Sequence, residues 1–125
     1  MASKKLTLEQ LIAAKSKRDK FMIKDVEIKS LGGRVTIQKL KYDVVLNAMD
    51  NITKESSMTN VMEVYKELIY KSVPMFQHAD LLKTYEVVEP YDIVTELLEL
   101  GEIMEVGSEI LSLYGFDGLD DEVKN

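Results

Sequence analysis

His78 is the single histidine of the chain, and Asp80 follows it two residues later. A histidine beside a carboxylate can act as a general base or bind a metal ion when a nucleophile or further ligands complete the site. The sequence has no cysteine, no Gly-x-Ser-x-Gly turn and no glutamate three residues before the histidine. We therefore expect His78 to occupy a structural or solvent-exposed position.

Five glutamates spaced three or four residues apart form the second group that could do chemistry: Glu96, Glu99, Glu102, Glu105 and Glu109. A carboxylate cluster can transfer protons or bind a divalent cation. At these spacings the side chains spread around the outside of two helices, opposite an apolar stripe, as on a solvated helix face. The sequence therefore predicts no metal site, no cofactor and no enzymatic activity.

Phosphate binding is the third chemistry to consider, at Gly32-Gly33 and in a basic run at residues 15–20. The glycine pair lies between two expected strands, whereas a nucleotide-binding loop joins a strand to a helix. The basic run has no interleaved aromatic residues and no recognisable reading helix. A small nucleic-acid-binding regulator remains the alternative function, and its contacts would come from Lys15, Lys17, Arg18 and Lys20.

The composition is that of one folded domain. Of the 125 residues, 46% are hydrophobic and 30% are charged, and two are proline. We expect a single domain over residues 1–125, with frayed ends at about 1–5 and 117–125. No apolar stretch is long enough for a membrane span or a signal peptide, and the absence of cysteine suits a reducing compartment. These features predict a cytoplasmic location.

The net charge of -6 is unevenly distributed along the chain. Residues 1–41 contain eleven Lys and Arg against four Asp and Glu, whereas residues 42–125 contain five against eighteen. The two parts therefore carry net charges of +7 and -13. Such a division can favour contacts between the basic part of one copy and the acidic part of another, so the sequence allows a homo-oligomer.

The clearest local pattern is a pair of alternating segments, 25–31 and 34–40, on either side of Gly32-Gly33. This pattern is typical of an antiparallel hairpin with a two-residue turn, which would place Ile28 opposite Ile37. A two-stranded ribbon is marginal alone, so we expect one of its faces to pack on helices. That face would carry Val26, Ile28, Val35 and Ile37.

Apolar residues recur at helical intervals in the rest of the chain. A capping box at Thr7 and Gln10 begins the first expected helix, which ends near Lys17. The other helices are expected at about 42–52, 58–73, 79–84, 90–100 and 102–114, with Gly101 as the end of the fifth. The predicted fold class is α+β: a mainly helical single domain with one antiparallel hairpin, at about 24–40, packed on about five helices.

Apolar side chains that one helix stripe does not require are candidates for contact with a partner. Some cluster where Pro90 restarts a helix, and others belong to the methionine-rich segment that begins at Met58. Flexible thioethers fill cores, and they also suit grooves that adapt to a partner helix. The candidate partner-binding residues are Tyr85, Val87, Val88, Tyr91, Met58, Met62 and Tyr65, with core packing as the alternative for each.

Several segments, taken together, resemble one known family. Residues 30–40, SLGGRVTIQKL, look like its early hairpin. The segments similar to its helical part are 69–74, 80–82, 88–94, 100–103 and 113–116. The resemblance extends from about Leu6 to Phe116, and the family is that of the XkdN-like tail assembly chaperones of phages and prophages.

The resemblance implies a non-catalytic function in the assembly of phage tails. A member of this family would bind the tape measure protein while the tail is built, and the tail tube protein would displace it. It would act in the cytoplasm of the host bacterium and would be absent from the mature virion. Many weak, reversible contacts could cover the apolar helical surface of a tape measure before the tube encloses it.

Overall fold

The computed structural model describes residues 3–20 and 23–116, and within them the chain is mainly helical. The helices are α1 (Leu8–Lys20), α2 (Tyr42–Lys54), α3 (Met58–Ser72), α4 (Ala79–Thr84), α5 (Ile93–Leu97) and α6 (Leu100–Ser112). The other elements are strands β1 (Ile23–Ile28) and β2 (Gly33–Gln38) and the 3-10 turns η1 (Lys29–Leu31), η2 (Pro74–Gln77) and η3 (Pro90–Asp92). The predicted α+β class is confirmed. Of the ends predicted to fray, residues 1–2 and 117–125 lie outside the described residues.

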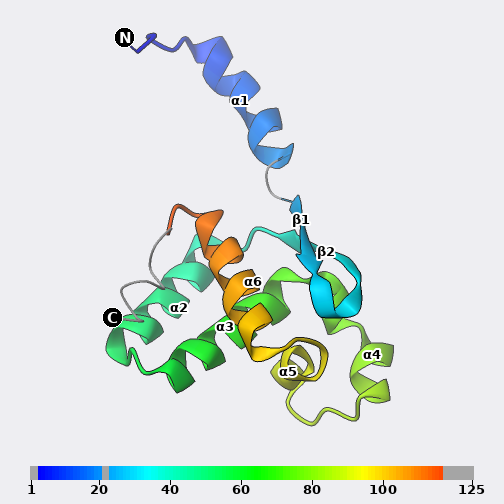
Figure 1. Ribbon diagram of the computed structural model, residues 1–125. Coiled ribbons are helices and arrows are strands. Elements are labelled where there is room, and N and C mark those ends of the chain that lie inside the picture. The colour runs from blue at the N-terminus through cyan, green and yellow to red at the C-terminus, as the bar shows by residue number, and fades with distance from the viewer. Residues whose placement is uncertain (1–2, 21–22, 117–125) are drawn as a thin grey trace.

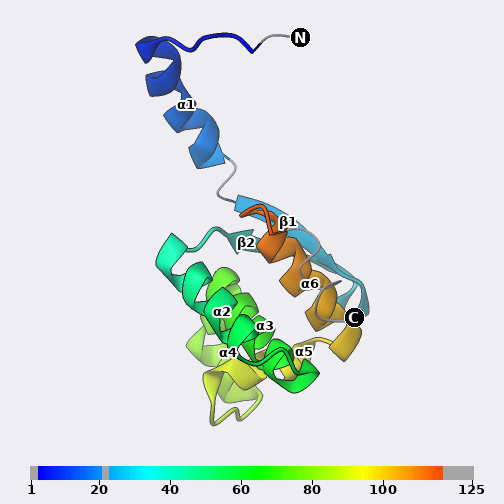
Figure 2. The same cartoon turned by 90° about the vertical axis from the view of Figure 1, so that its left-hand side faces the viewer.

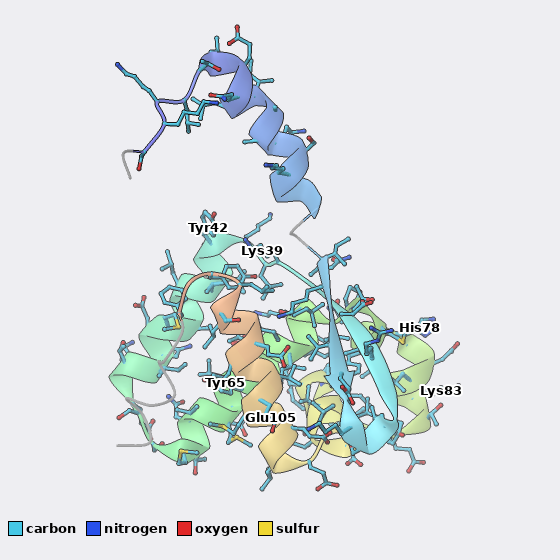
Figure 3. All side chains as sticks on the ribbon, turned by 45° about the horizontal axis from the view of Figure 1, so that its top comes forward. Lys39, Tyr42, Tyr65, His78, Lys83 and Glu105 are labelled. Carbon is cyan, nitrogen blue, oxygen red and sulfur yellow. The ribbon has the colours of Figure 1, made fainter. Side chains whose placement is uncertain are left out.

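Helix α3 is the centre of the body, by which we mean residues 23–116 (Figure 1). It packs against α2, α5 and α6, and the hairpin lies beside α6 (Figure 2). Where α3 and α6 meet, a Cβ added to Gly107 would lie only 2.4 Å from Cδ2 of Tyr65. The missing side chain of Gly107 therefore lets α6 approach the ring of Tyr65, which is enclosed between the helices (Figure 3).

The hairpin has a different register from the predicted one, and its loop is longer. Ile28 pairs with Gly33 instead of Ile37, so the loop consists of residues 29–32. Gly32 ends this loop with a φ of 71°, a left-handed conformation that glycine adopts readily. Because the partner of Ile28 moves by four residues, an even number, the predicted face is preserved. It carries Val26, Ile28 and Ile37, which are buried, and Val35, which is partly buried.

A carboxylate on α6 holds this longer loop in place. Glu102 accepts hydrogen bonds from the backbone N–H of Ser30, at 3.0 Å, and from the Ser30 hydroxyl, at 2.6 Å. The same carboxylate accepts a hydrogen bond from the N–H of Glu99 at 3.0 Å, in the capping box that begins α6. Since 72 residues separate Ser30 from Glu102, no local pattern in the sequence could reveal this contact.

The ends of α2, α3 and α4 agree with the sequence prediction to within two residues, whereas α1 continues to Lys20 and α5 is shorter than the predicted range 90–100 because its first turn is the 3-10 turn η3. Thr7 and Gln10 form the expected capping box, with N–H to side-chain distances of 2.9 and 3.3 Å. Helix α4 has the predicted bounds. The prediction for Gly101 is wrong, because this residue lies in the first turn of α6, which the capping box of Glu99 and Glu102 begins ahead of it.

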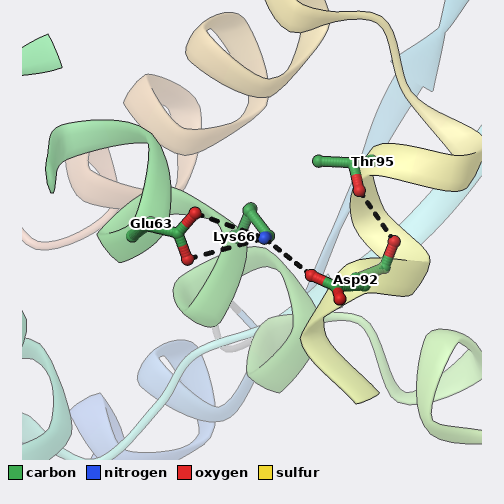
Figure 4. A network of polar contacts seen from close by, with 4 residues as sticks. All are labelled: Glu63, Lys66, Asp92 and Thr95. Atoms are coloured by element: carbon green, nitrogen blue, oxygen red, sulfur yellow. Dashed lines mark hydrogen bonds and ion pairs between the residues drawn. The ribbon is translucent and has the colours of Figure 1, made fainter. Parts of the chain in front are cut away.

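An ion-pair network joins α3 to η3 (Figure 4). The ammonium nitrogen of the buried Lys66 lies 2.8 Å from a carboxylate oxygen of Asp92 and 3.4 Å from one of Glu63. Burial alone would lower the pKa of Lys66, but the hydrogen bond to Asp92 and the two negative charges raise it above the ordinary value of 10.5. The network therefore fixes η3 against α3 at the point where the chain restarts a helix.

Helix α1 stands away from the body in both views (Figures 1 and 2). We call residues 3–20, which contain α1, the arm. The body alone contains the hairpin and the five helices α2 to α6. Among the described residues, no helix has both the length and the apolar character required to cross a membrane.

Candidate functional site

The polar side chains that could do chemistry are structural or exposed. His78 is exposed at the start of α4, where its Nδ1 accepts a hydrogen bond from the N–H of Asp80 at 3.2 Å. Glu105 is an exposed residue of α6. Within residues 3–20 and 23–116, no three His, Asp or Glu side chains gather closely enough to hold a metal ion. The exposed apolar side chains are therefore the candidates to consider.

The first group of predicted contact residues lies in the segment 85–91, between α4 and α5, which we call the joint. Val88 is 99% exposed and Tyr85 is 41% exposed, whereas Val87 is half-buried. Between them, Glu86 has a φ of 54°, in the left-handed region that residues with side chains seldom adopt. The joint thus presents one fully exposed aliphatic side chain on an unusual stretch of backbone.

Tyr91 anchors the joint to the body. Its ring packs on that of Tyr70 in α3, with the centroids 5.1 Å apart and the rings tilted by 58°. Its hydroxyl donates a hydrogen bond to Glu67 at 3.5 Å, and Glu67 also pairs with Lys71 at 3.1 Å. Tyr91 is therefore partly committed to internal contacts, and Val88 and Tyr85 are the more accessible residues.

The second group of predicted contact residues is on α3. Met58 is about half exposed and Met62 is partly buried, but Tyr65 is only 1% exposed and lies against Gly107. Tyr65 therefore has no surface to offer a partner while this fold persists, because its place on the helix stripe points into the core. Met58 and Tyr70 are twelve residues apart, which is about 18 Å along a helix, so the α3 group and the joint form separate surfaces.

A groove that the sequence reasoning missed lies between α2 and the end of α6. Its volume is about 340 Å³, and its lining is mainly apolar. Tyr42 and Leu46 belong to the apolar residues that recur at helical intervals in α2, but they are 62% and 55% exposed. We define the groove by the residues that line it: Lys39, Tyr42, Val45, Leu46, Leu113, Tyr114 and Phe116.

Tyr114 fixes the wall of the groove. Its hydroxyl oxygen accepts a hydrogen bond from the N–H of Leu40, which ties the end of α6 to the chain that leaves β2. The ammonium of Lys39 lies over its ring, 5.7 Å from the centroid. Burial raises the pKa of Tyr114 above its ordinary value of 10.0. The sequence signal was the apolar run at 113–116, which continues past the last turn of α6.

The arm provides a further apolar surface. Leu8, Leu11 and Ile12 are each more than half exposed, and their spacing places them on one face of α1. Leu6, just before the helix, is also exposed. The described residues therefore offer four apolar surfaces: the arm, the groove, the joint and the start of α3.

The comparison with known protein families gives a match over nearly the whole chain. Residues 3–125 match the family described as phage XkdN-like tail assembly chaperone protein. Comparisons with curated proteins and with solved structures found no match. Since the matched range contains the hairpin, all the helices described and all four apolar surfaces, the chain belongs to the family of phage XkdN-like tail assembly chaperone proteins.

Proposed function

We propose that the chain binds the tape measure protein during tail assembly and covers its apolar helical surface until tail tube subunits replace the chaperone. Membership in a tail assembly chaperone family supports this function over the nucleic-acid-binding alternative. The binding involves no catalysis. The chaperone acts in the cytoplasm of the host bacterium and is absent from the mature virion.

The exposed side chain of Val88 in the joint is the observation that carries the proposal. Nearly all of its surface is in water, and burying it against an apolar helix would release about 25 cal/mol for each Å². Tyr85, in the same joint, adds an aromatic side chain, a residue type common at protein interfaces. We propose the joint as the main contact with the tape measure and Met58 as a second, weaker contact.

Weak contacts at two surfaces suit a chaperone that must later leave its partner. A long tape measure can hold many copies side by side, so that their combined occupancy is high although each copy dissociates quickly. Polymerising tube subunits can then displace the copies one by one. Met58 is about 18 Å along α3 from Tyr70, against which the joint packs. One copy can therefore contact an extended partner at two separate places.

Calorimetric titration of a tape measure fragment with the purified chain tests the proposal. We expect Val88→Gln to weaken binding about ten-fold, because a buried valine contributes about 1.5–3 kcal/mol and ten-fold corresponds to about 1.4 kcal/mol. The matched control is Leu31→Gln, which changes an exposed leucine of η1, outside the joint. Equal affinities of Val88→Gln and the unchanged chain would exclude the joint. A folded fragment that the unchanged chain does not bind would exclude the tape measure.

A further inference from the structure

The arm has an apolar face that nothing in its own body covers. Leu8, Leu11 and Ile12 are exposed on one side of α1, and the helix stands away from the body (Figure 1). Helix α1 has 13 residues, a length at which an isolated helix is only marginally stable in water. A surface that buries these three side chains would therefore stabilise both the helix and its position.

The groove has the size and chemistry to accept these side chains. Its volume of about 340 Å³ is roughly twice that of an apolar cavity of about 150 Å³, which holds a benzene molecule. Aliphatic and aromatic side chains form most of its lining, and Leu46 is exposed at its edge. Such a space is large enough for side chains of leucine size that extend from one helix face.

The groove lies at the end of the body to which the arm is joined (Figure 3). β1 begins at Ile23, whose partner in the hairpin is Gln38, and the next residue, Lys39, lines the groove. Figure 3 shows Lys39 and Tyr42 at the end of the body from which α1 extends. In a two-fold pair of copies the contacts are reciprocal, so an arm that docks into the groove of its partner leaves its own groove for the arm of that partner.

The arm and the body have net charges of opposite sign. The arm contains six Lys and Arg against two Asp and Glu, a net charge of +4. Residues 23–116 contain nine against sixteen, a net charge of -7. The arm of one copy is therefore attracted to the body of another.

From these observations we propose that α1 of one copy docks its Leu8, Leu11 and Ile12 face into the groove of a second copy, and that the exchange is reciprocal. The inference does not depend on the identity of the tape measure as partner. It assigns the groove to a second copy of this chain and leaves the joint for the client protein.

Cysteine cross-linking tests the docking directly, because the chain has no cysteine of its own. Leu11→Cys and Leu46→Cys place single thiols on the arm and at the groove, both at exposed positions. When the two variants are mixed and oxidised, we expect a disulfide between residues 11 and 46 of different copies, identified by mass spectrometry. The control pairs Leu11→Cys with Val88→Cys, a position in the joint that is more exposed than Leu46, and its yield defines random collision.

A variant that carries both cysteines in one chain distinguishes docking between two copies from docking within a single copy. Covalent dimers support the proposal, whereas a disulfide within a single chain would show that the arm covers its own groove and would overturn it. A yield no higher than the control would also overturn it.

Sedimentation of full-length variants provides a second measurement. We expect the unchanged chain to dimerise and Leu11→Asp or Leu46→Asp to weaken the dimer at least about ten-fold, because each puts a charge into an apolar contact. Val88→Asp should dimerise normally. A monomeric unchanged chain would contradict the proposal. So would a Leu46→Asp chain that dimerises normally but no longer binds the tape measure, since the groove would then belong to the client.

Discussion

Glu102 shows how one exposed carboxylate can join distant parts of the chain. It accepts two hydrogen bonds from Ser30 and one from the N–H of Glu99, and these bonds lower its pKa below the ordinary value of 4.5. The bond from the Ser30 hydroxyl contributes most to this shift. A carboxyl group whose pKa is lower in the folded than in the unfolded state stabilises the fold above the unfolded pKa. That stabilisation is lost as the pH falls through the folded pKa.

We therefore predict that Glu102→Gln lowers the melting temperature at neutral pH. The amide presents an NH₂ group to one of the three donors, so at least one hydrogen bond is lost. The difference from the unchanged chain should begin to shrink as the pH falls below 4.5 and should disappear below the lowered pKa of the folded state, where Glu102 is protonated too. Thermal unfolding, followed by circular dichroism at several pH values, measures the difference in melting temperature between the two chains. Glu105→Gln, an exposed change on the same helix, is the control, and a pH-independent gap for Glu102→Gln would contradict the mechanism.

The contact of α3 with α6 depends on the absence of a side chain at Gly107. A Cβ there would lie 2.4 Å from Cδ2 of the buried Tyr65 ring, and the ring has no free space into which to move. We predict that Gly107→Ala destabilises the fold by about 1–2 kcal/mol, because a contact of 2.4 Å puts the overpacking cost in the upper part of its usual range of about 1–3 kcal/mol, and helix propensity returns only about 1 kcal/mol. Urea unfolding measures the change.

The control for this prediction lies in the same helix. Gly101 is in the first turn of α6, and a Cβ added to it would meet no atom within 4 Å. Gly101→Ala should therefore stabilise the chain by about 0.5–1 kcal/mol through helix propensity alone. If both alanine variants were stabilised equally, the close approach of α6 to Tyr65 would not limit the packing.

The periodicity of the sequence predicted most helices and both strands. The register of the hairpin was predicted wrongly, because contacts between residues distant in sequence determine its loop. The hairpin and the helices follow from local spacing, and the capping box at Thr7 is confirmed. The loop of the hairpin depends on Ser30 and its contact with Glu102, which is remote in sequence. Local patterns fix which residues share a face, and this is why an even shift in register left the buried face intact.

The candidate surfaces were harder to predict than the elements. The apolar stripe of a helix indicates which side faces the core. It does not indicate how many residues of that stripe are covered by the elements packed against the helix. Tyr42 and Leu46 belong to such a stripe and remain exposed because α6 ends beside them and leaves the groove. Tyr65 shows the opposite case, since the glycine opposite it allowed full burial. The exposed state of Val88 could be anticipated, because the joint lies between helices.

In the whole molecule, charge is divided between two parts that also differ in how they are packed. The arm has a net charge of +4 and extends from a body whose net charge is -7 (Figure 1), although the basic part of the sequence, residues 1–41, also includes the hairpin of the body. Attraction between exposed charges is screened over about 10 Å at 0.1 M salt and over about 3 Å at 1 M. Burial of apolar side chains is not screened in this way. Salt should therefore separate the two contributions to docking of the arm.

We predict that the dissociation constant of the dimer rises on the order of ten-fold between these two salt concentrations. Lys5→Glu combined with Lys17→Glu should weaken the dimer at low salt and have little effect at high salt, since both changes lie in the arm and act through charge. Leu11→Asp should weaken it at both concentrations, because it also removes an apolar contact. Sedimentation equilibrium measures the dissociation constants of the unchanged chain, the double lysine variant and Leu11→Asp at both salt concentrations. If Leu11→Asp weakened the dimer but salt and the lysine changes did not, apolar burial in the groove alone would hold the dimer. The charges of the arm would then make no contribution to its docking.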